Sequence, residues 1–302
     1  MTAIGLGKII LLGEHAVVYG DPALAAALDR GVAIAAVPTP AGGSLRIDIP
    51  AWNLKAKATD DHPVARSLEA IADELGVGRP AVTLVGDAQI PPGAGLGSSA
   101  ALAVAVARAL LAHDKRSADH ATVTRAAGIS EDLMHGRASG IDVAFAASGG
   151  IGVYRRATGV RAFSTPALRV LVGPSGAPRS TSAMVDKVAA ATNALADDTR
   201  LRELGGLTDT GTAALVARDL AGVGATMNRA HQVLAGLGVS TPLLDSLCDL
   251  AREAGAHGAK LTGAGGGGAV IAIAPRDNEQ AVLAAWKRAN VTGFVATIGG
   301  GA

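Results

Sequence analysis

The segment from Pro91 to Ala100 constrains the fold of this chain more than any other. Its sequence, PPGAGLGSSA, has three alternating glycines and then two serines before an apolar run. Alternating glycines let the backbone adopt positive φ and approach a ligand closely. A helix that begins at the serines presents unpaired N–H groups and the positive end of its dipole, which suits phosphate. An ordinary glycine-rich turn with a serine N-cap is the alternative, and no Lys precedes Ser98 as a Walker A loop requires.

The hydrophobic periodicity of the 302-residue chain predicts a mixed α+β protein. Strands are expected at 4–12, 31–37, 44–49, 81–85, 151–154, 168–172, 269–274 and 293–298. Helices are expected at 62–75, 99–113, 119–135, 180–196, 208–235, 240–255 and 277–289. The turn-rich segment 38–43 is expected to join the second and third strands as a hairpin. The pattern of elements changes near residue 165, which predicts two domains, 1–165 and 166–302.

The charge balance and the cysteine content narrow the class of protein. Lys and Arg total 27 and Asp and Glu total 26. Because no basic cluster interrupts that balance, we expect neither a nucleic-acid partner nor an anionic membrane partner. Cys248 is the single cysteine, so no intrachain disulfide can form. No apolar segment has the pattern of a signal peptide or the length of a membrane span, and we expect a soluble, cytoplasmic protein.

A second glycine-rich run, Gly263 to Gly268, matches the pattern Gly-x-Gly-x-x-Gly. A dinucleotide-binding loop follows a strand and opens a helix. Here we expect the run to follow a helix and to precede the strand at 269–274, which argues against dinucleotide binding. A turn packed against another ligand-binding segment fits better, and a loop with purely conformational glycines is the alternative.

Four polar residues are candidates for site chemistry. Glu14 and His15 follow the first strand. The pair fits two interpretations equally well: a polar site, or a capping glutamate beside a hydrogen-bonded structural histidine. Lys8 lies inside that strand and either extends to solvent or faces an anion. Glu131 and Asp142 could converge on one Mg²⁺ and one hydroxyl, although surface charge is the default for each. His135 lies between them without a second His or Cys at ligand spacing, so zinc is not expected.

Three motifs, taken in order, resemble those of a known family. They are KIILLGEHAVVYG at 8–20, PPGAGLGSSAA at 91–101 and KLTGAGGGG at 260–268, and the segment 131–150 resembles the same family's catalytic segment. Together they are similar to the GHMP kinase superfamily, and the form GEHAVV is similar to its mevalonate kinase family. The resemblance implies a two-domain fold, with an N-terminal domain like domain 2 of ribosomal protein S5 and a ferredoxin-like C-terminal domain.

The resemblance also implies an activity and a set of roles. The activity is ATP-dependent phosphorylation of (R)-mevalonate to 5-phosphomevalonate in isoprenoid biosynthesis, with ATP as co-substrate, Mg²⁺ as cofactor and a homodimer as the assembly. Asp142 matches the catalytic base and Lys8 the lysine that pairs with it. Ser99 and Glu131 match the Mg²⁺ ligands. The ATP-binding positions are Pro92, Gly93, Ala94, Gly95, Leu96, Gly97, Ser98 and Ser99. The acceptor-binding positions are Lys8, Glu14, His15, Asp142, Thr181, Gly263 and Ala264.

Two positions depart from the family pattern. Members usually carry Pro before Ser-Gly-Ile-Asp and Asn after it, where this chain has Ala138 and Val143. Val143 is closer to phosphomevalonate kinases, so another GHMP small-molecule kinase is one alternative. A non-catalytic nucleotide or metabolite sensor on the same fold is a second. The presence of Lys8, Ser99, Glu131 and Asp142 argues against the sensor.

Overall fold

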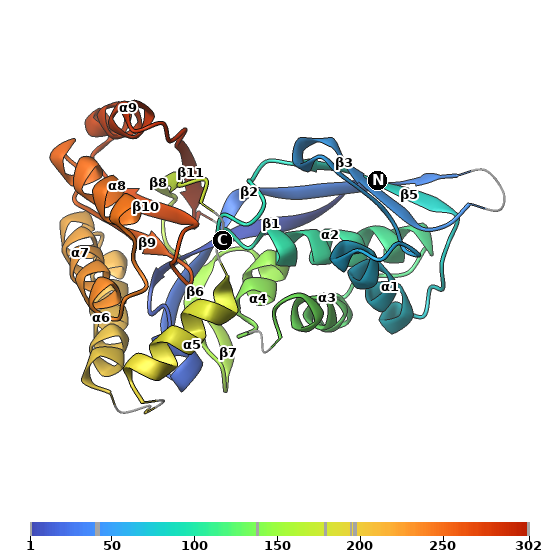
Figure 1. Cartoon of the computed structure of the whole chain (residues 1–302), viewed down its shortest axis with the longest axis horizontal. Helices are drawn as coiled ribbons and strands as arrows, with labels where there is room; N and C mark the ends of the chain where they lie inside the picture. The colour runs from blue at the N-terminus through green and yellow to red at the C-terminus, as the bar shows by residue number, and fades with distance from the viewer. Residues whose placement is uncertain are drawn as a thin grey trace. The chain divides into compact units, whose positions relative to one another are not determined.

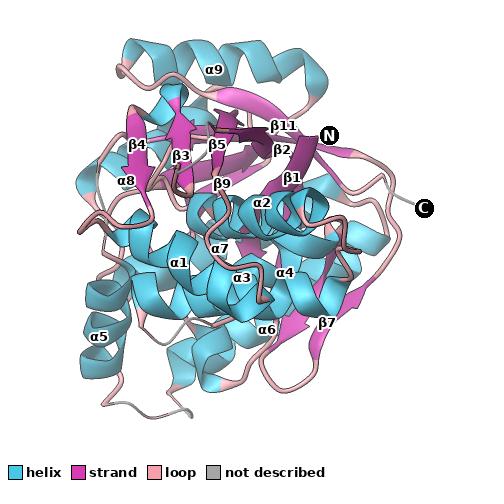
Figure 2. Cartoon of the chain, turned by 90° about the vertical axis from the view of Figure 1, so that its right-hand side faces the viewer, coloured by secondary structure: helices cyan, strands magenta, loops and turns pink. Residues whose placement is uncertain are grey.

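The computed structural model describes residues 2–39, 43–136, 139–177, 180–193, 195 and 198–300. They form two compact units, each built from separate stretches of chain. Unit 1 comprises Met1–Gly7, Arg30–Pro92 and Gly97–Gly149, and unit 2 comprises Lys8–Asp29, Gly93–Leu96 and Gly150–Ala302. Both units contain strands and helices, which confirms the α+β class (Figure 2). The predicted domain boundary near residue 165 stays a prediction.

The strands of unit 1 form a mixed sheet in which neighbours are ordered β4, β3, β5 and β2. Their bounds are β2 Ala23–Pro38, β3 Arg46–Ile49, β4 Leu54–Lys57 and β5 Val82–Ala88. Strand β5 pairs antiparallel with β2 and parallel with β3. Strand β1, Thr2–Leu12, pairs with β2. The predicted hairpin between 31–37 and 44–49 is wrong, because β5 lies between these two strands and supplies both with hydrogen-bond partners.

Helices pack against one another on one side of these strands (Figure 1). They are α1 Pro63–Leu75, α2 Ser98–His113, α3 His120–His135 and α4 Ile141–Ser148. Helix α2 contains alanine, valine and leucine around its whole circumference, and most of its residues are buried. A helix that is apolar on all sides belongs in the interior of a domain. From Ala100 onward the helix is therefore held by packing on every side.

Unit 2 contains an antiparallel sheet with the order β11, β8, β10, β9. The strands are β8 Leu168–Pro174, β9 Gly258–Thr262, β10 Ala269–Ile273 and β11 Phe294–Ile298. Strand β8, the first of the four in sequence, lies between β11 and β10, and strand β9 forms an edge of the sheet. This is the ferredoxin-like order, which confirms the expected C-terminal fold. Strands β6 Ile151–Arg155 and β7 Gly159–Ala162 pair elsewhere in the unit, β6 with residues 23–26 of β2.

Helices α7, α8 and α9 contact this sheet, and α6 packs on α7. The helices of unit 2 are α5 Thr181–Ala191, α6 Thr199–Val216, α7 Leu220–Gly236, α8 Pro242–Glu253 and α9 Glu279–Arg288. The single helix predicted at 208–235 is wrong. Arg218 has φ 61°, and the Asp219 side chain accepts from the N–H of Gly222 at 2.9 Å, so one helix ends and another begins here.

Strand β9 was not predicted, and it changes the context of the second glycine-rich run. Gly263 to Gly268 follows a strand rather than a helix and leads into β10, with which β9 pairs antiparallel. The run is thus the turn of a β-hairpin. A dinucleotide-binding loop opens a helix, whereas this run leads into a strand. The run is therefore still not expected to bind a dinucleotide.

The end of β1 leads into Gly13, which has φ 93°. A Cβ there would lie 2.4 Å from the Pro22 carbonyl oxygen and 2.7 Å from the Ala23 Cα. Backbone packing and a left-handed conformation therefore both require glycine at this position. Gly20 has a similar φ of 102°, but no atom lies within 4 Å of its Cβ position.

We expect Gly13→Ala to destabilise unit 2 more than Gly20→Ala. The Gly20 variant incurs backbone strain alone, about 1–3 kcal/mol. The Gly13 variant adds a clash with rigid backbone of about 1–3 kcal/mol or more. Urea denaturation followed by the fluorescence of Trp286, in a Trp52→Phe background, measures both. Equal losses would mean that Pro22 and Ala23 move aside at little cost.

Candidate functional site

The glycine-rich loop has the backbone expected of an anion-binding turn. Gly93, Gly95 and Gly97 have φ of 69°, 81° and 70°. Gly97 is the N-cap of α2 and supplies no side-chain hydrogen bond, so the helix begins at Ser98. The serine N-cap considered from sequence is therefore wrong. The N-cap thus has no side chain that could satisfy the first N–H groups of the helix.

Ser99, Glu131 and His135 lie together in unit 1, and we call them the Ser99 cluster. The Ser99 Oγ lies 3.1 Å from the His135 Nε2, which lies 3.9 Å from the Glu131 Oε2. Glu131 and His135 are one turn apart on α3, and Glu131 is 3% exposed. The cluster offers a hydroxyl and a buried carboxylate, which are hard oxygen ligands of the kind Mg²⁺ prefers.

Asp142 occupies the first turn of α4, behind the N-cap Gly140 with φ 83°. A carboxylate in the first turn interacts favourably with the helix dipole. Its side chain is partly exposed. Lys8 lies in unit 2, inside β1 with 2% of its surface exposed, and its N–H donates to the Leu96 carbonyl of the glycine-rich loop at 2.8 Å. The first and second motifs are thus in direct backbone contact.

The first and third motifs meet through buried polar side chains of unit 2. We call Glu14, His15, Lys260, Thr262 and Ala264 the Glu14 cluster. The Lys260 ammonium donates to the Glu14 Oε1 and, at 2.6 Å, to the Leu261 carbonyl. The Thr262 hydroxyl accepts from the Ile10 N–H at 2.9 Å and donates to the Ile10 carbonyl at 3.0 Å. The His15 Nε2 lies 2.9 Å from the Ala264 carbonyl oxygen.

Burial dominates the electrostatics of the Glu14 cluster. Lys260 is 0% exposed and Glu14 is 1% exposed. Burial raises the pKa of Glu14, and the charge of Lys260 opposes that rise. Burial likewise lowers the pKa of Lys260, opposed by the charge of Glu14. Each group therefore depends on the other to remain charged.

The remaining predicted acceptor residues in unit 2 are Gly263 and Ala264, within the third motif, and Thr181 on α5. Thr181 is the first residue of α5, whose N-cap Ser180 accepts from the N–H of Ala183 at 3.3 Å. A Cβ on Gly266 would lie 2.6 Å from the Met184 sulfur of α5, so this helix packs directly against the glycine-rich turn. The structure thus brings the third motif and the N-terminal part of α5 together in unit 2.

Three residues without a role in the sequence analysis take part in these clusters. They are His135, Lys260 and Thr262. A lysine between Ala259 and Leu261 was a usable signal for a buried charge pair. Its partner could not be identified from sequence, because Glu14 lies 246 residues away.

A neutral histidine network adjoins Lys260. The His231 Nδ1 accepts from the Leu261 N–H at 3.3 Å, so the proton is on Nε2, which donates to the Asp245 Oδ1 at 3.0 Å. Burial lowers the pKa of His231, and the charge of Lys260 adds to that effect. Burial raises the pKa of the neighbouring Cys248 thiol to about 12, so this cysteine is not a nucleophile.

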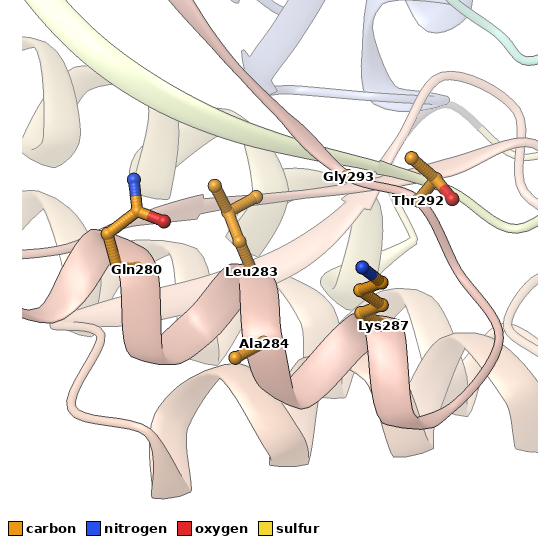
Figure 3. A pocket seen from close by; sticks show the side chains of 6 residues that line it. All are labelled: Gln280, Leu283, Ala284, Lys287, Thr292 and Gly293. Atoms are coloured by element: carbon orange, nitrogen blue, oxygen red, sulfur yellow. The ribbon is translucent and has the colours of Figure 1, made fainter.

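A pocket on another part of unit 2 contains none of the predicted site residues (Figure 3). Gln280, Leu283, Ala284 and Lys287 of α9 line it together with Thr292 and Gly293. Its single cationic side chain is that of Lys287, and no carboxylate faces it. We assign it no role. No helix in the described part of the chain is long and apolar enough to cross a membrane, and no group of three His, Cys, Asp or Glu residues there could bind a metal.

We expect Lys260→Met to lower the free energy of unfolding by about 3–5 kcal/mol, because it leaves a buried carboxylate without its cation. The double variant Glu14→Gln, Lys260→Met removes both charges and should lose less. Urea denaturation measures both losses. Lys55→Met is the control, since Lys55 is 77% exposed in its pair with Asp48 and should change stability by no more than about 1 kcal/mol. A double variant less stable than Lys260→Met would contradict the charge argument.

The lowered pKa of His231 predicts a loss of stability in acid. The unfolded chain takes up the proton at about pH 6.5 and the folded chain only at lower pH, so the contribution is complete above 6.5 and lost as pH falls through the folded pKa. Protonation would also break the bond from Leu261. Denaturation midpoints between pH 7 and pH 5 should fall more steeply for the wild type than for His231→Gln. Parallel slopes would exclude His231 as the titrating group.

With this geometry described, comparison with known proteins identifies the family. Residues 62–150 match the GHMP kinases N terminal domain and residues 212–292 the GHMP kinases C terminal domain. A curated mevalonate kinase of Thermococcus sibiricus is 35% identical, over 92% of this chain and 90% of that protein.

Solved structures agree. An L. major mevalonate kinase in complex with R-mevalonate matches with a TM-score of 0.86 and 26% identity, over 99% of this chain and 96% of that one. The Methanococcus jannaschii mevalonate kinase matches with a TM-score of 0.85 and 25% identity, over 99% and 98%. The chain therefore belongs to the GHMP kinase superfamily, in its mevalonate kinase family.

Proposed function

We propose that this chain transfers the γ-phosphoryl group of ATP to (R)-mevalonate, giving 5-phosphomevalonate for isoprenoid biosynthesis by the mevalonate pathway. The Glu14 cluster is the observation that carries this proposal. It holds the segment GEHAVV, which is the part of the first motif similar to mevalonate kinases, against the glycine-rich turn of the third motif. The R-mevalonate complex of the L. major relative supports the same acceptor.

The glycine-rich loop and the N-terminus of α2 are proposed to bind the ATP phosphates. The residues are Pro92, Gly93, Ala94, Gly95, Leu96, Gly97, Ser98 and Ser99. The uncapped helix N-terminus and the positive φ of the glycines support this assignment. Phosphoryl transfer requires mainly that the reactants be positioned and that charge on the moving group be neutralised.

Ser99 and Glu131 are the proposed Mg²⁺ ligands. Their oxygen donors fit a cation that keeps several waters and uses one or two protein ligands together with substrate phosphates. That mode of binding is also consistent with the lack of a three-residue metal group in the described part of the chain. When bound, Mg²⁺ would neutralise phosphate charge. The His135 imidazole holds the Ser99 hydroxyl at 3.1 Å, within one turn of Glu131.

Asp142 and Lys8 are the proposed catalytic residues. Asp142 would accept a hydrogen bond from the acceptor hydroxyl and orient it toward phosphorus, and Lys8 would polarise that hydroxyl and the transferred group. Both positions support these roles: Asp142 lies at a helix N-terminus, and Lys8 is attached through its backbone to the phosphate loop. Glu14, His15, Thr181, Gly263 and Ala264 would complete the acceptor pocket. A homodimer and a cytoplasmic location are proposed from the family alone.

Val143 motivates a second candidate, phosphomevalonate kinase. The side chain is only 3% exposed in α4, so its difference from the usual Asn alters packing in unit 1. Ala138, the other departure, lies outside the described residues. Glu14 and His15, by contrast, occupy the position where phosphomevalonate kinases tend to have Glu-Tyr. The acceptor is best decided by a panel of mevalonate, phosphomevalonate, homoserine and galactose.

We expect a coupled ADP-release assay to show turnover with mevalonate and at most background rates with the other three acceptors. Asp142→Ala should lower kcat by about 10²–10⁴-fold, because the hydroxyl loses the group that orients it. Nucleotide binding, measured by calorimetry, should be unchanged.

Asp114→Ala is the matched control, because Asp114 is an exposed aspartate in the same unit at the end of α2. Its kcat should equal that of the wild type. Fast turnover by Asp142→Ala would remove that residue from the mechanism. Turnover of phosphomevalonate in place of mevalonate would establish the second candidate.

A further inference from the structure

Among the described residues, Lys260 is the largest fully buried charged side chain to which the family resemblance assigns no role. It opens the third motif, is 0% exposed, and reaches the first motif through the Glu14 Oε1. Both residues belong to unit 2. The contact joins two segments that the proposed function places at the acceptor.

Stability alone does not account for a buried pair of this kind. Taking both charges out of water costs several kcal/mol per ion, and replacing such pairs by apolar residues is often neutral or stabilising. Strand β9 is otherwise a fully buried apolar or small-residue strand, in which a leucine or methionine would pack at position 260. A specific use of the Glu14 carboxylate is therefore the simpler reason for keeping Lys260.

The second oxygen of Glu14 indicates that use. Glu14 Oε2 is buried and has no hydrogen-bond partner in the described part of the chain. A buried carboxylate oxygen without a donor is costly, and such atoms are rare in native proteins. Lys260 takes Oε1 and restricts rotation of the carboxylate, so Oε2 keeps one direction. An oxygen of this kind is suited to a hydroxyl donor on a bound ligand.

The neighbouring charges support an anionic ligand. Lys8 is close enough to stabilise the charged form of Glu14 and to disfavour that of Lys260. Two lysine charges therefore act on one carboxylate, which favours an anionic ligand over a cationic one. His15, the next residue, has φ 63°, a strained conformation that its bond to the Ala264 carbonyl helps to hold.

We propose that Lys260 is a positioning residue for the acceptor substrate: it holds Glu14 Oε1 so that Oε2 accepts a hydrogen bond from a hydroxyl group of an anionic acceptor. The inference rests on the proposed function for the identity of that acceptor. Lys260 itself does not contact the substrate. Its effect passes through Glu14 and concerns binding of the acceptor, not binding of ATP.

The test is a double-mutant cycle of steady-state kinetics with Glu14→Gln, Lys260→Met and the double variant. Each variant removes or misplaces the hydrogen bond between the acceptor hydroxyl and the charged Glu14 carboxylate. The acceptor KM should therefore rise about 10- to 100-fold, while the KM for ATP stays within about twofold. The double variant should match Glu14→Gln, because Lys260 acts only through that carboxylate. Lys287→Met, which removes an exposed lysine of α9 in the same unit, should leave both KM values unchanged.

Several results would overturn the proposal. They are an unchanged acceptor KM in folded Lys260→Met, equal rises in both KM values, or a double variant whose loss is the product of the two single losses. If Lys260→Met does not fold, the double variant is used instead, because it carries no unpaired buried charge. An acceptor KM equal to that of Glu14→Gln supports the proposal, and a higher acceptor KM contradicts it. If the wild type uses a different acceptor from the panel, the proposed function fails and the same cycle is run with that acceptor. A wild type that turns over none contradicts both.

Discussion

The contact between strand β9 and the end of β1 is the interaction on which the proposed acceptor site depends. The Thr262 hydroxyl does here what the backbone of a neighbouring strand would do. It accepts a hydrogen bond from the Ile10 N–H and donates one to the Ile10 carbonyl. Lys260, two residues earlier on the same strand, donates to Glu14. Because side chains two apart on a strand share a face, one face of β9 supplies both contacts. The glycine-rich turn that follows then lies where His15 reaches the Ala264 carbonyl.

Glycine and burial make this arrangement rigid. Gly13 admits the backbone of Pro22 and Ala23 so closely that no Cβ fits, whereas a Cβ on Gly266 would meet the flexible side chain of Met184. The polar atoms beyond these contacts are fully desolvated, where electrostatic interactions are stronger than in water. His231 extends the network from Leu261 to Asp245 and stays neutral in it. A kinase that works by positioning and charge neutralisation benefits from groups that cannot reorganise.

The candidate site residues of unit 1 include side chains in the first turns of two helices. Glycines, Gly97 and Gly140, are the N-caps of α2 and α4, and Ser99 and Asp142 are in the first turns of those helices. The apolar, Ala-rich α2 is buried from Ala100 onward and its N-cap is Gly97, so the serines do not act as caps. Ser99 instead faces His135. Ser99 is therefore not the N-cap, and its role as a Mg²⁺ ligand stays a proposal.

The sequence by itself determined the α+β class, the phosphate loop and its helix, and the family, because these depend on local glycine patterns, periodicity and contiguous motifs. Only the tertiary structure decided that β5 separates β2 from β3, that two helices replace one at 208–235, and that a strand, β9, precedes the glycine-rich run Gly263 to Gly268. Strand order and pairing are set by long-range contacts, which local propensity does not encode. The same holds for Lys260. A lysine in an apolar strand signals a buried charge, but its carboxylate partner is 246 residues distant and is defined only when the chain folds.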